Sequence, residues 1–163
     1  MTHLGTMRGR DGSAFAWCVS PPVPIPPADV WARRYDDVTC DACLAMLAAQ
    51  EPVLSTARAL IKHPSQWTTG HLVAAVDVSG APCGAREACA VAWSGWGAVL
   101  AVVGSITPEG DALPAIRMLD AACPRVGAFS YWHESATHQQ VLEVFDRALT
   151  EAERVAARRE RAA

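Results

Sequence analysis

The sequence lacks an excess of positive charge, and this absence excludes one broad class of function. Its 163 residues carry 14 Lys and Arg against 17 Asp and Glu, which gives a formal net charge of −3. Proteins that attract nucleic acid through overall electrostatics carry a basic excess instead. We therefore do not expect the chain as a whole to be a nucleic-acid-binding protein.

The sequence also lacks a signal peptide and a convincing membrane span. The N-terminal stretch MTHLGTMRGRDGSAF has neither an apolar core nor a small-residue cleavage site, so we expect a cytoplasmic protein. In that compartment the six cysteines are metal ligands or buried thiols rather than disulfides. The charge-free run 88–106 is rich in Ala and Gly and has no flanking basic cluster, which favours a buried helix over a transmembrane segment.

The first part of the chain, residues 1–50, is rich in proline. Five prolines fall between Pro21 and Pro27, which excludes a helix and a central strand there because proline has no backbone N–H. Such a segment cannot build a hydrophobic core of its own. We therefore expect a bound metal to stabilise it.

The strongest metal signal is the stretch VTCDACL, in which Cys40 and Cys43 form a Cys-x-x-Cys turn. Cys18 and His3 supply two further donors, and three thiolates with one imidazole form a closed tetrahedral zinc site with a structural role. Another histidine, a water molecule or a side chain of a partner could replace His3. A redox pair is the alternative, but the residues before Cys40 do not resemble a buried strand.

The second part, residues 51–163, is predicted to be a small domain of about four or five helices. A helix is expected from Glu51 and Pro52 until Pro64 ends it, and the stretch HLVAAVDVSG is expected to be extended and closed by a turn. Further helices are predicted over 86–103, over DALPAIRMLDAAC with Asp111 as its cap, and after a capping box. That capping box pairs Thr137 with Gln140. The fold class is thus mostly α, with an N-terminal zinc knuckle within residues 1–50.

Two resemblances follow from these stretches. The order of an early His-Leu, a lone cysteine, a proline-bearing spacer and VTC-x-x-CL resembles short zinc-binding segments of actinobacterial and phage proteins, which implies metal binding and no reaction. Residues from about 51 to 150 are similar to an actinobacterial and phage domain family of unknown function. The matching positions are Trp67, Gly70, Trp93, Gly97, Ala98 and Trp132. The chain departs from that pattern at Ser94, where the family often has Cys, and at His133 and Glu134, where it has Asn and Asp.

Catalysis is an alternative that the sequence leaves open. Ser94 with His71 and with His133 or Glu134 could act as nucleophile, base and orienting group in a small hydrolase or transferase. However, the first glycine of Gly-x-Ser-x-Gly is missing, so a small residue chosen for close helix packing is the preferred interpretation. Trp93 and Trp132 would line the same candidate pocket. Cys83, Cys89 and Cys123 are interpreted as small buried hydrophobic residues.

These observations together favour a non-enzymatic binding module. Trp17 and Trp31 lie in the proline-rich segment, where they either anchor a partner protein or pack over the zinc knuckle. We expect a phage or mobile-element accessory protein that contacts a host protein. Nucleic-acid binding through the knuckle is a third alternative, in which the charge of the arginines would be offset by neighbouring aspartates. The arginines are Arg8, Arg10, Arg33 and Arg34, and the aspartates are Asp11, Asp29, Asp36 and Asp37.

Overall fold

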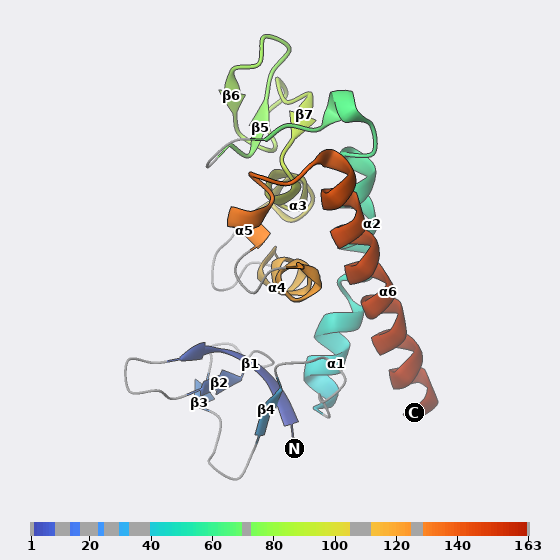
Figure 1. The fold of residues 1–163 in the computed structure, drawn as a ribbon. Helices are drawn as coiled ribbons and strands as arrows, with labels where there is room; N and C mark the ends of the chain where they lie inside the picture. Colours follow the sequence, from blue (N-terminus) through green and yellow to red (C-terminus); the bar gives the residue numbers. More distant parts are fainter. Residues whose placement is uncertain are drawn as a thin grey trace. The chain divides into compact units, whose positions relative to one another are not determined.

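The chain is mostly α-helical, as the sequence predicts (Figure 1). The computed structural model describes residues 2–8, 14–16, 23–24, 30–32, 40–69, 73–104, 112–124 and 129–162, the first four ranges by their backbone alone. The helices are α1 (Asp41–Ala48), α2 (Glu51–Leu60), η2 (Pro64–Gln66), α3 (Gly95–Val103), α4 (Ala112–Ala122), α5 (Phe129–Trp132) and α6 (His138–Ala162). None of the helices in these ranges is both long and apolar enough to cross a lipid bilayer.

The chain forms two compact units. The first comprises Met1–Ala49 and Glu151–Ala163, and the second comprises Gln50–Thr150. Helix α6 runs through the boundary, so its first half belongs to the second unit and its last turns to the first.

The first unit contains a sheet and helix α1. The sheet has the strand order β3-β2-β1-β4, with β1 parallel to β4 and antiparallel to β2. Its strands are β1 (Thr2–Arg8), β2 (Ala14–Ala16), β3 (Val23–Pro24) and β4 (Val30–Ala32). The strand that contains a proline lies at the edge of the sheet, where a missing N–H breaks no ladder, so the prediction that this segment forms no central strand is confirmed.

In the second unit, helix α2 begins and ends where the sequence predicts. Glu51 and Pro52 stand in its first turn, and the chain turns into η2 at Pro64. The helix packs against α3 through buried apolar side chains. The buried core of this unit includes Leu54, Ala57, Ile61, Ala98, Val99, Ala115, Ile116, Met118, Leu119, Phe129, Val141, Val144, Phe145 and Ala148.

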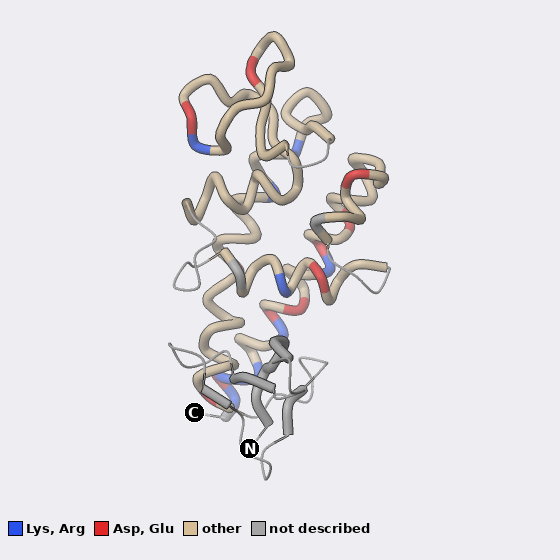
Figure 2. Tube along the Cα trace, turned by 90° about the vertical axis from the view of Figure 1, so that its left-hand side faces the viewer, with Lys and Arg blue, Asp and Glu red and all other residues tan. Residues whose placement is uncertain are grey.

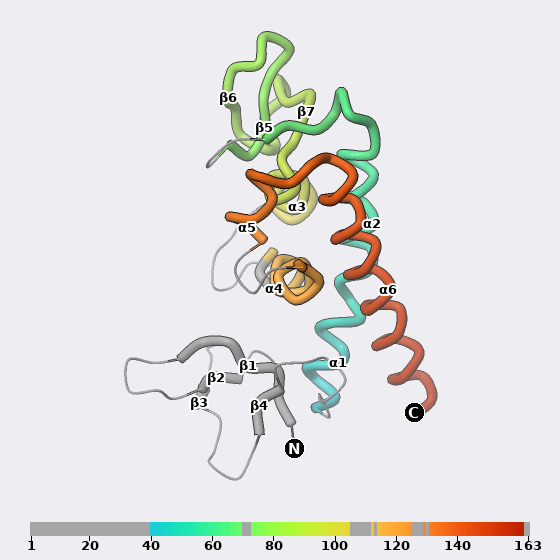
Figure 3. The backbone as a smooth tube through the Cα atoms, viewed as in Figure 1, coloured from blue at the N-terminus to red at the C-terminus, as the bar shows by residue number. Residues whose placement is uncertain are grey.

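Residues 75–93 form a small antiparallel sheet with the order β6-β5-β7 (Figure 3). Its strands are β5 (Ala75–Val76), β6 (Pro82–Cys83) and β7 (Ala92–Trp93). The predicted turn after β5 is confirmed: the Asp77 carboxylate accepts hydrogen bonds from the backbone N–H groups of Ser79 and Ala81, at 2.8 and 3.0 Å. The hydrogen bond from the Ser79 hydroxyl is the main reason why the pKa of Asp77 is lowered.

The prediction of one continuous helix over 86–103 is wrong. Residues 84–91 form turns, β7 follows, and the helix begins only at Gly95. The reason is the cap: the Ser94 hydroxyl accepts a hydrogen bond from the Gly97 N–H at 3.0 Å, and the extended backbone of Ser94 stops the helix from continuing toward the N-terminus. At its other end α3 stops at Gly104, which adopts a left-handed conformation with φ 88°.

Helix α6 starts at the predicted capping box. The Gln140 side chain accepts a hydrogen bond from the Thr137 N–H at 2.8 Å, and the Thr137 hydroxyl accepts one from the Gln140 N–H at 3.3 Å. Asp111, the expected cap of α4, lies outside the described residues.

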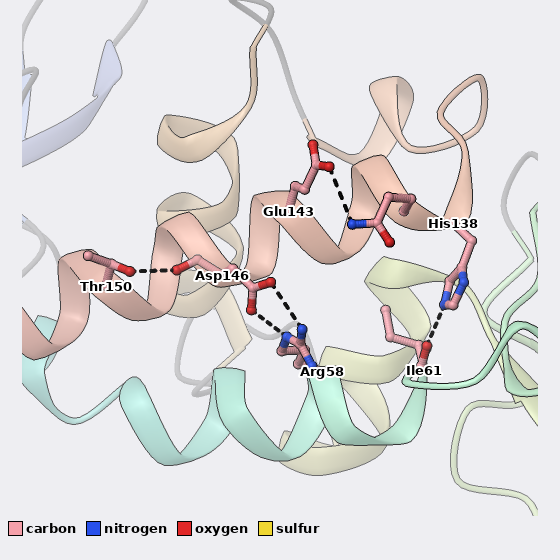
Figure 4. A network of polar contacts seen from close by, with 7 residues as sticks. Arg58, Ile61, His138, Glu143, Asp146 and Thr150 are labelled. Carbon is pink, nitrogen blue, oxygen red and sulfur yellow. Dashed lines mark hydrogen bonds and ion pairs between the residues drawn. The ribbon is translucent and has the colours of Figure 1, made fainter.

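Polar contacts join α2 to the first half of α6 (Figure 4). Arg58 donates two hydrogen bonds to the carboxylate of Asp146, from Nε to Oδ1 at 2.5 Å and from Nη2 to Oδ2 at 3.0 Å. At the start of α6, the His138 ring donates from Nε2 to the carbonyl of Ile61 at 2.6 Å and lies against Trp67, with ring centroids 5.2 Å apart. These contacts fix the C-terminal end of α2 to the N-terminal half of α6.

The Arg58–Asp146 pair is expected to contribute little to stability. The two side chains are 29% and 53% exposed, so solvent screens the pair. A double-mutant cycle with Arg58→Met and Asp146→Asn should give a coupling energy of about 0.5 to 1 kcal/mol in urea unfolding, which falls as salt is added. A coupling energy that is large and independent of salt would contradict this expectation.

Candidate functional site

The Cys-x-x-Cys pair lies at the N-terminal end of α1. Cys40 is the N-cap residue with an extended backbone (φ −78°, ψ 118°), and Cys43 is the third residue of the helix. Both are buried, with exposed fractions of 5% and 0%. The positive end of the helix dipole favours thiolates at these positions. Helix α1 thus brings both cysteines to one buried helix end.

The structure describes only part of the predicted zinc site and partner anchors. His3 lies in β1, where its backbone is in register with Trp31 of the parallel strand β4. Cys18, a predicted ligand, and Trp17, a predicted anchor, lie outside the described residues.

Ser94 is a helix cap in this structure. It is completely buried, and its hydroxyl accepts from the Gly97 N–H and lies 3.4 Å from the carbonyl oxygen of Ala74, to which it can donate. Both contacts are with backbone groups. Ser94 thus starts α3 as its N-cap, a role that the sequence analysis did not assign to it.

The other candidate pocket residues also take part in local structure. His133 is 4% exposed; its Nδ1 lies 2.9 Å from the Phe129 carbonyl oxygen, and its ring stacks on that of Phe129. The Trp93 indole donates to the Ala85 carbonyl at 2.8 Å. Trp132 and Glu134 are half-buried beside His133 in the chain, and His71 lies outside the described residues.

A cluster of potential metal ligands that the sequence analysis did not identify is formed by the last residue of β6 and by the loop between β6 and β7. The sulfur atoms of Cys83 and Cys89 and a carboxylate oxygen of Glu87 all lie within 4.8 Å of one another. The Cys89 sulfur lies 3.5 Å from Glu87 Oε2, as a donor to the carboxylate. We call these three residues the loop cluster.

Two consecutive turns create the loop cluster. The Glu87 N–H donates to the Gly84 carbonyl at 3.1 Å, and the Ala90 N–H donates to the Glu87 carbonyl at 3.0 Å. A side chain on Gly84 would meet the Glu87 carboxylate, because a Cβ built there would lie 3.0 Å from Oε1. The absence of a side chain at this position therefore lets Glu87 fold back toward the cysteines.

The surroundings of Cys89 in the loop cluster oppose its ionisation. The pKa of the Cys89 thiol is raised to about 11. The main cause is the hydrogen bond between the Cys89 and Cys83 side chains, followed by loss of hydration and by the hydrogen bond to Glu87. A thiolate at Cys89 would be formed next to a carboxylate, and this repulsion opposes ionisation unless a cation is bound.

The interpretation of the remaining cysteines as buried hydrophobic residues is wrong for Cys89, which is exposed, whereas Cys83 and Cys123 are half-buried. The physical reason is the late start of α3: residues 84–91 form turns at the surface and not a helix that packs in the core. Pro82 and Gly84 flank Cys83, and residues of these types indicate turns and loops. This pattern was the sequence signal that could have placed Cys83 outside the core.

Comparisons with known proteins give one match. No curated protein and no solved structure matches the chain. A family model does match, over residues 47–151, and this agrees with the predicted resemblance to a family of unknown function over about 51–150. Because the match spans more than half of its residues, the chain belongs to the family of unknown function DUF6197.

Proposed function

We propose that this protein is a non-enzymatic binding module, in which zinc stabilises the N-terminal segment and that segment contacts a host protein. The zinc ligands are Cys18, Cys40, Cys43 and His3, and the module acts in the cytoplasm as an accessory protein of a phage or mobile element. The observation that carries the proposal is the position of Cys40 and Cys43 at the cap and third residue of α1, both buried. Two buried thiols at one helix end form half of a tetrahedral zinc site.

The charge distribution supports a protein partner over nucleic acid. In the described part of the chain, basic and acidic residues are interspersed along the trace (Figure 2), and α6 carries charges of both signs. The segment 73–104 carries only Asp77, Arg86 and Glu87 as charged residues. Nucleic-acid binding relies on a concentration of Lys and Arg that neutralises several phosphates.

Zinc analysis tests the metal part of this proposal. Protein purified without a histidine tag should lose one zinc per chain when Cys40→Ser and Cys43→Ser are combined, because both substitutions remove ligands of one closed site. Cys123→Ser is the matched control, since this half-buried cysteine is no proposed ligand, and it should keep its zinc content. An unchanged zinc content in the double variant would refute the zinc knuckle.

The same double variant tests whether the knuckle serves binding. Loss of zinc removes a free energy of about 10 kcal/mol from the N-terminal segment, while residues 50–150 keep their own buried core and most of the helical circular-dichroism signal. Affinity capture from the native host should recover a stoichiometric protein with the unsubstituted chain and with Cys123→Ser, but not with the double variant. Global unfolding of the double variant would contradict a separable module, and equal capture would contradict a binding role of the knuckle.

A further inference from the structure

We propose that the loop cluster of Cys83, Glu87 and Cys89 is a second metal site, which binds a thiophilic divalent cation such as Zn²⁺ with one coordination position left open. This site is separate from the proposed zinc knuckle and does not depend on it. The three ligand atoms come from one short segment, the end of β6 and the loop after it, and already lie within 4.8 Å of one another.

The spacing of the ligand atoms is close to what zinc requires. Zn–S bonds of about 2.3 Å and Zn–O bonds of about 2.1 Å place neighbouring ligands of a tetrahedron about 3.5 to 3.8 Å apart. The Cys89 sulfur and Glu87 Oε2 are 3.5 Å apart, which is that separation. The three ligand atoms, all within 4.8 Å of one another, therefore lie near the separations that a tetrahedral zinc site needs.

The backbone of the loop is held in place independently of a metal. The Trp93 indole donates to the Ala85 carbonyl at 2.8 Å, and the Val91 N–H donates to the Val76 carbonyl at 2.9 Å. The Arg86 guanidinium is directed toward Gly104 at the C-terminal end of α3, where a Cβ on Gly104 would collide with it. A positive charge at this position complements the negative end of the helix dipole.

Chemistry selects the type of ion. Two thiolates and one carboxylate suit Zn²⁺, whereas Mg²⁺ and Ca²⁺ require oxygen ligands. Three protein ligands leave the fourth position to water or to a ligand from another molecule, which is the difference between an open and a closed zinc site. Because Glu87 and Cys89 are exposed, we expect the ion at this site to exchange with solution.

Cobalt titration of the full-length chain tests the proposal. In the Cys40→Ser, Cys43→Ser background, metal-free reduced protein should take up one Co²⁺ and develop a thiolate-to-cobalt charge-transfer band. Adding Cys83→Ser and Cys89→Ser should abolish the band, and Glu87→Gln should weaken binding about 10-fold or more, as the loss of one ligand predicts. Cys123→Ser should leave the band unchanged.

A second measurement keeps the test valid if that background does not fold. In the otherwise unsubstituted chain, Cys83→Ser with Cys89→Ser should lower the cobalt or zinc capacity by one ion per chain and leave the helical signal intact. If the proposed zinc knuckle binds no metal, Cys83→Ser with Cys89→Ser should still remove one bound ion per chain. The experiment therefore distinguishes the two proposals. An unchanged capacity in this variant, or a Cys83–Cys89 disulfide that persists under reducing conditions and blocks uptake, would overturn the second site.

Discussion

Replacing Gly97 with alanine should destabilise the folded chain by about 3 kcal/mol or more, at the upper end of the range for overpacking a buried site. Gly97 is buried in the first turn of α3, and a Cβ there would overlap the carbonyl group of Ala74. That carbonyl oxygen accepts a hydrogen bond from the Ser94 N–H at 3.0 Å, so it cannot move away without breaking the contact that starts the helix. Urea unfolding followed by tryptophan fluorescence measures the effect.

Gly80→Ala is the control for the glycine substitution itself. Gly80 has a φ of 83°, but a Cβ there meets nothing within 4 Å. Gly80→Ala should therefore lower the free energy of unfolding only by the strain of an alanine in the left-handed conformation, about 1 to 2 kcal/mol. If Gly97→Ala costs no more than Gly80→Ala, the close approach of α3 to Ala74 is not important for stability.

The helices with local start and stop signals could be predicted from the sequence. Glu51 and Pro52 stand in the first turn of α2, and the Thr137–Gln140 box precedes α6; both signals involve residues near in sequence, and both helices begin where the signals lie. Such signals work because the atoms that satisfy the free N–H groups of a helix end come from the next turn.

The region before α3 could not be predicted in the same way. The run CAVAWSGWGAVLAVV has no charged residue and is mostly apolar, and an apolar run alone does not distinguish a buried strand from a buried helix. The strands β6 and β7 have two residues each, too few for an alternating pattern. The local signal that separates the strand from the helix is Ser94, a residue type that commonly caps helices. The interpretation of Ser94 as a packing residue or a nucleophile does not use this signal.

The loop cluster depends on the same region. A Cys-x₅-Cys spacing has no fixed geometry of its own, because the distance between the sulfur atoms is set by the turns between them. When residues 86–103 are taken as one helix, Cys89 belongs to the core and Cys83 to a separate loop. Two turns, at Gly84–Glu87 and Glu87–Ala90, bring them together instead.

Phe129→Ala should produce the other large loss of stability, about 3 to 5 kcal/mol in urea unfolding. The Phe129 side chain is fully buried, meets Phe145 edge to face with centroids 6.0 Å apart and stacks on His133 at 5.4 Å. Alanine would leave a cavity between these rings and remove both aromatic contacts. Tyr131→Ala, in the same short helix but 70% exposed, is the matched control and should cost less than about 1 kcal/mol.

Gly95 provides an internal test of where the Phe129 ring lies. A Cβ on Gly95 would lie 2.7 Å from Cζ of Phe129, so Gly95→Ala alone should cost about 1 to 3 kcal/mol by overpacking. In the Phe129→Ala background the collision is absent, and the added methyl group instead fills part of the cavity. The two substitutions should therefore be strongly non-additive, with the double variant more stable than the sum of the single effects by at least about 1 kcal/mol. Additive effects would show that the ring of Phe129 does not contact the start of α3, and the packing of α5 on that helix end would then need revision.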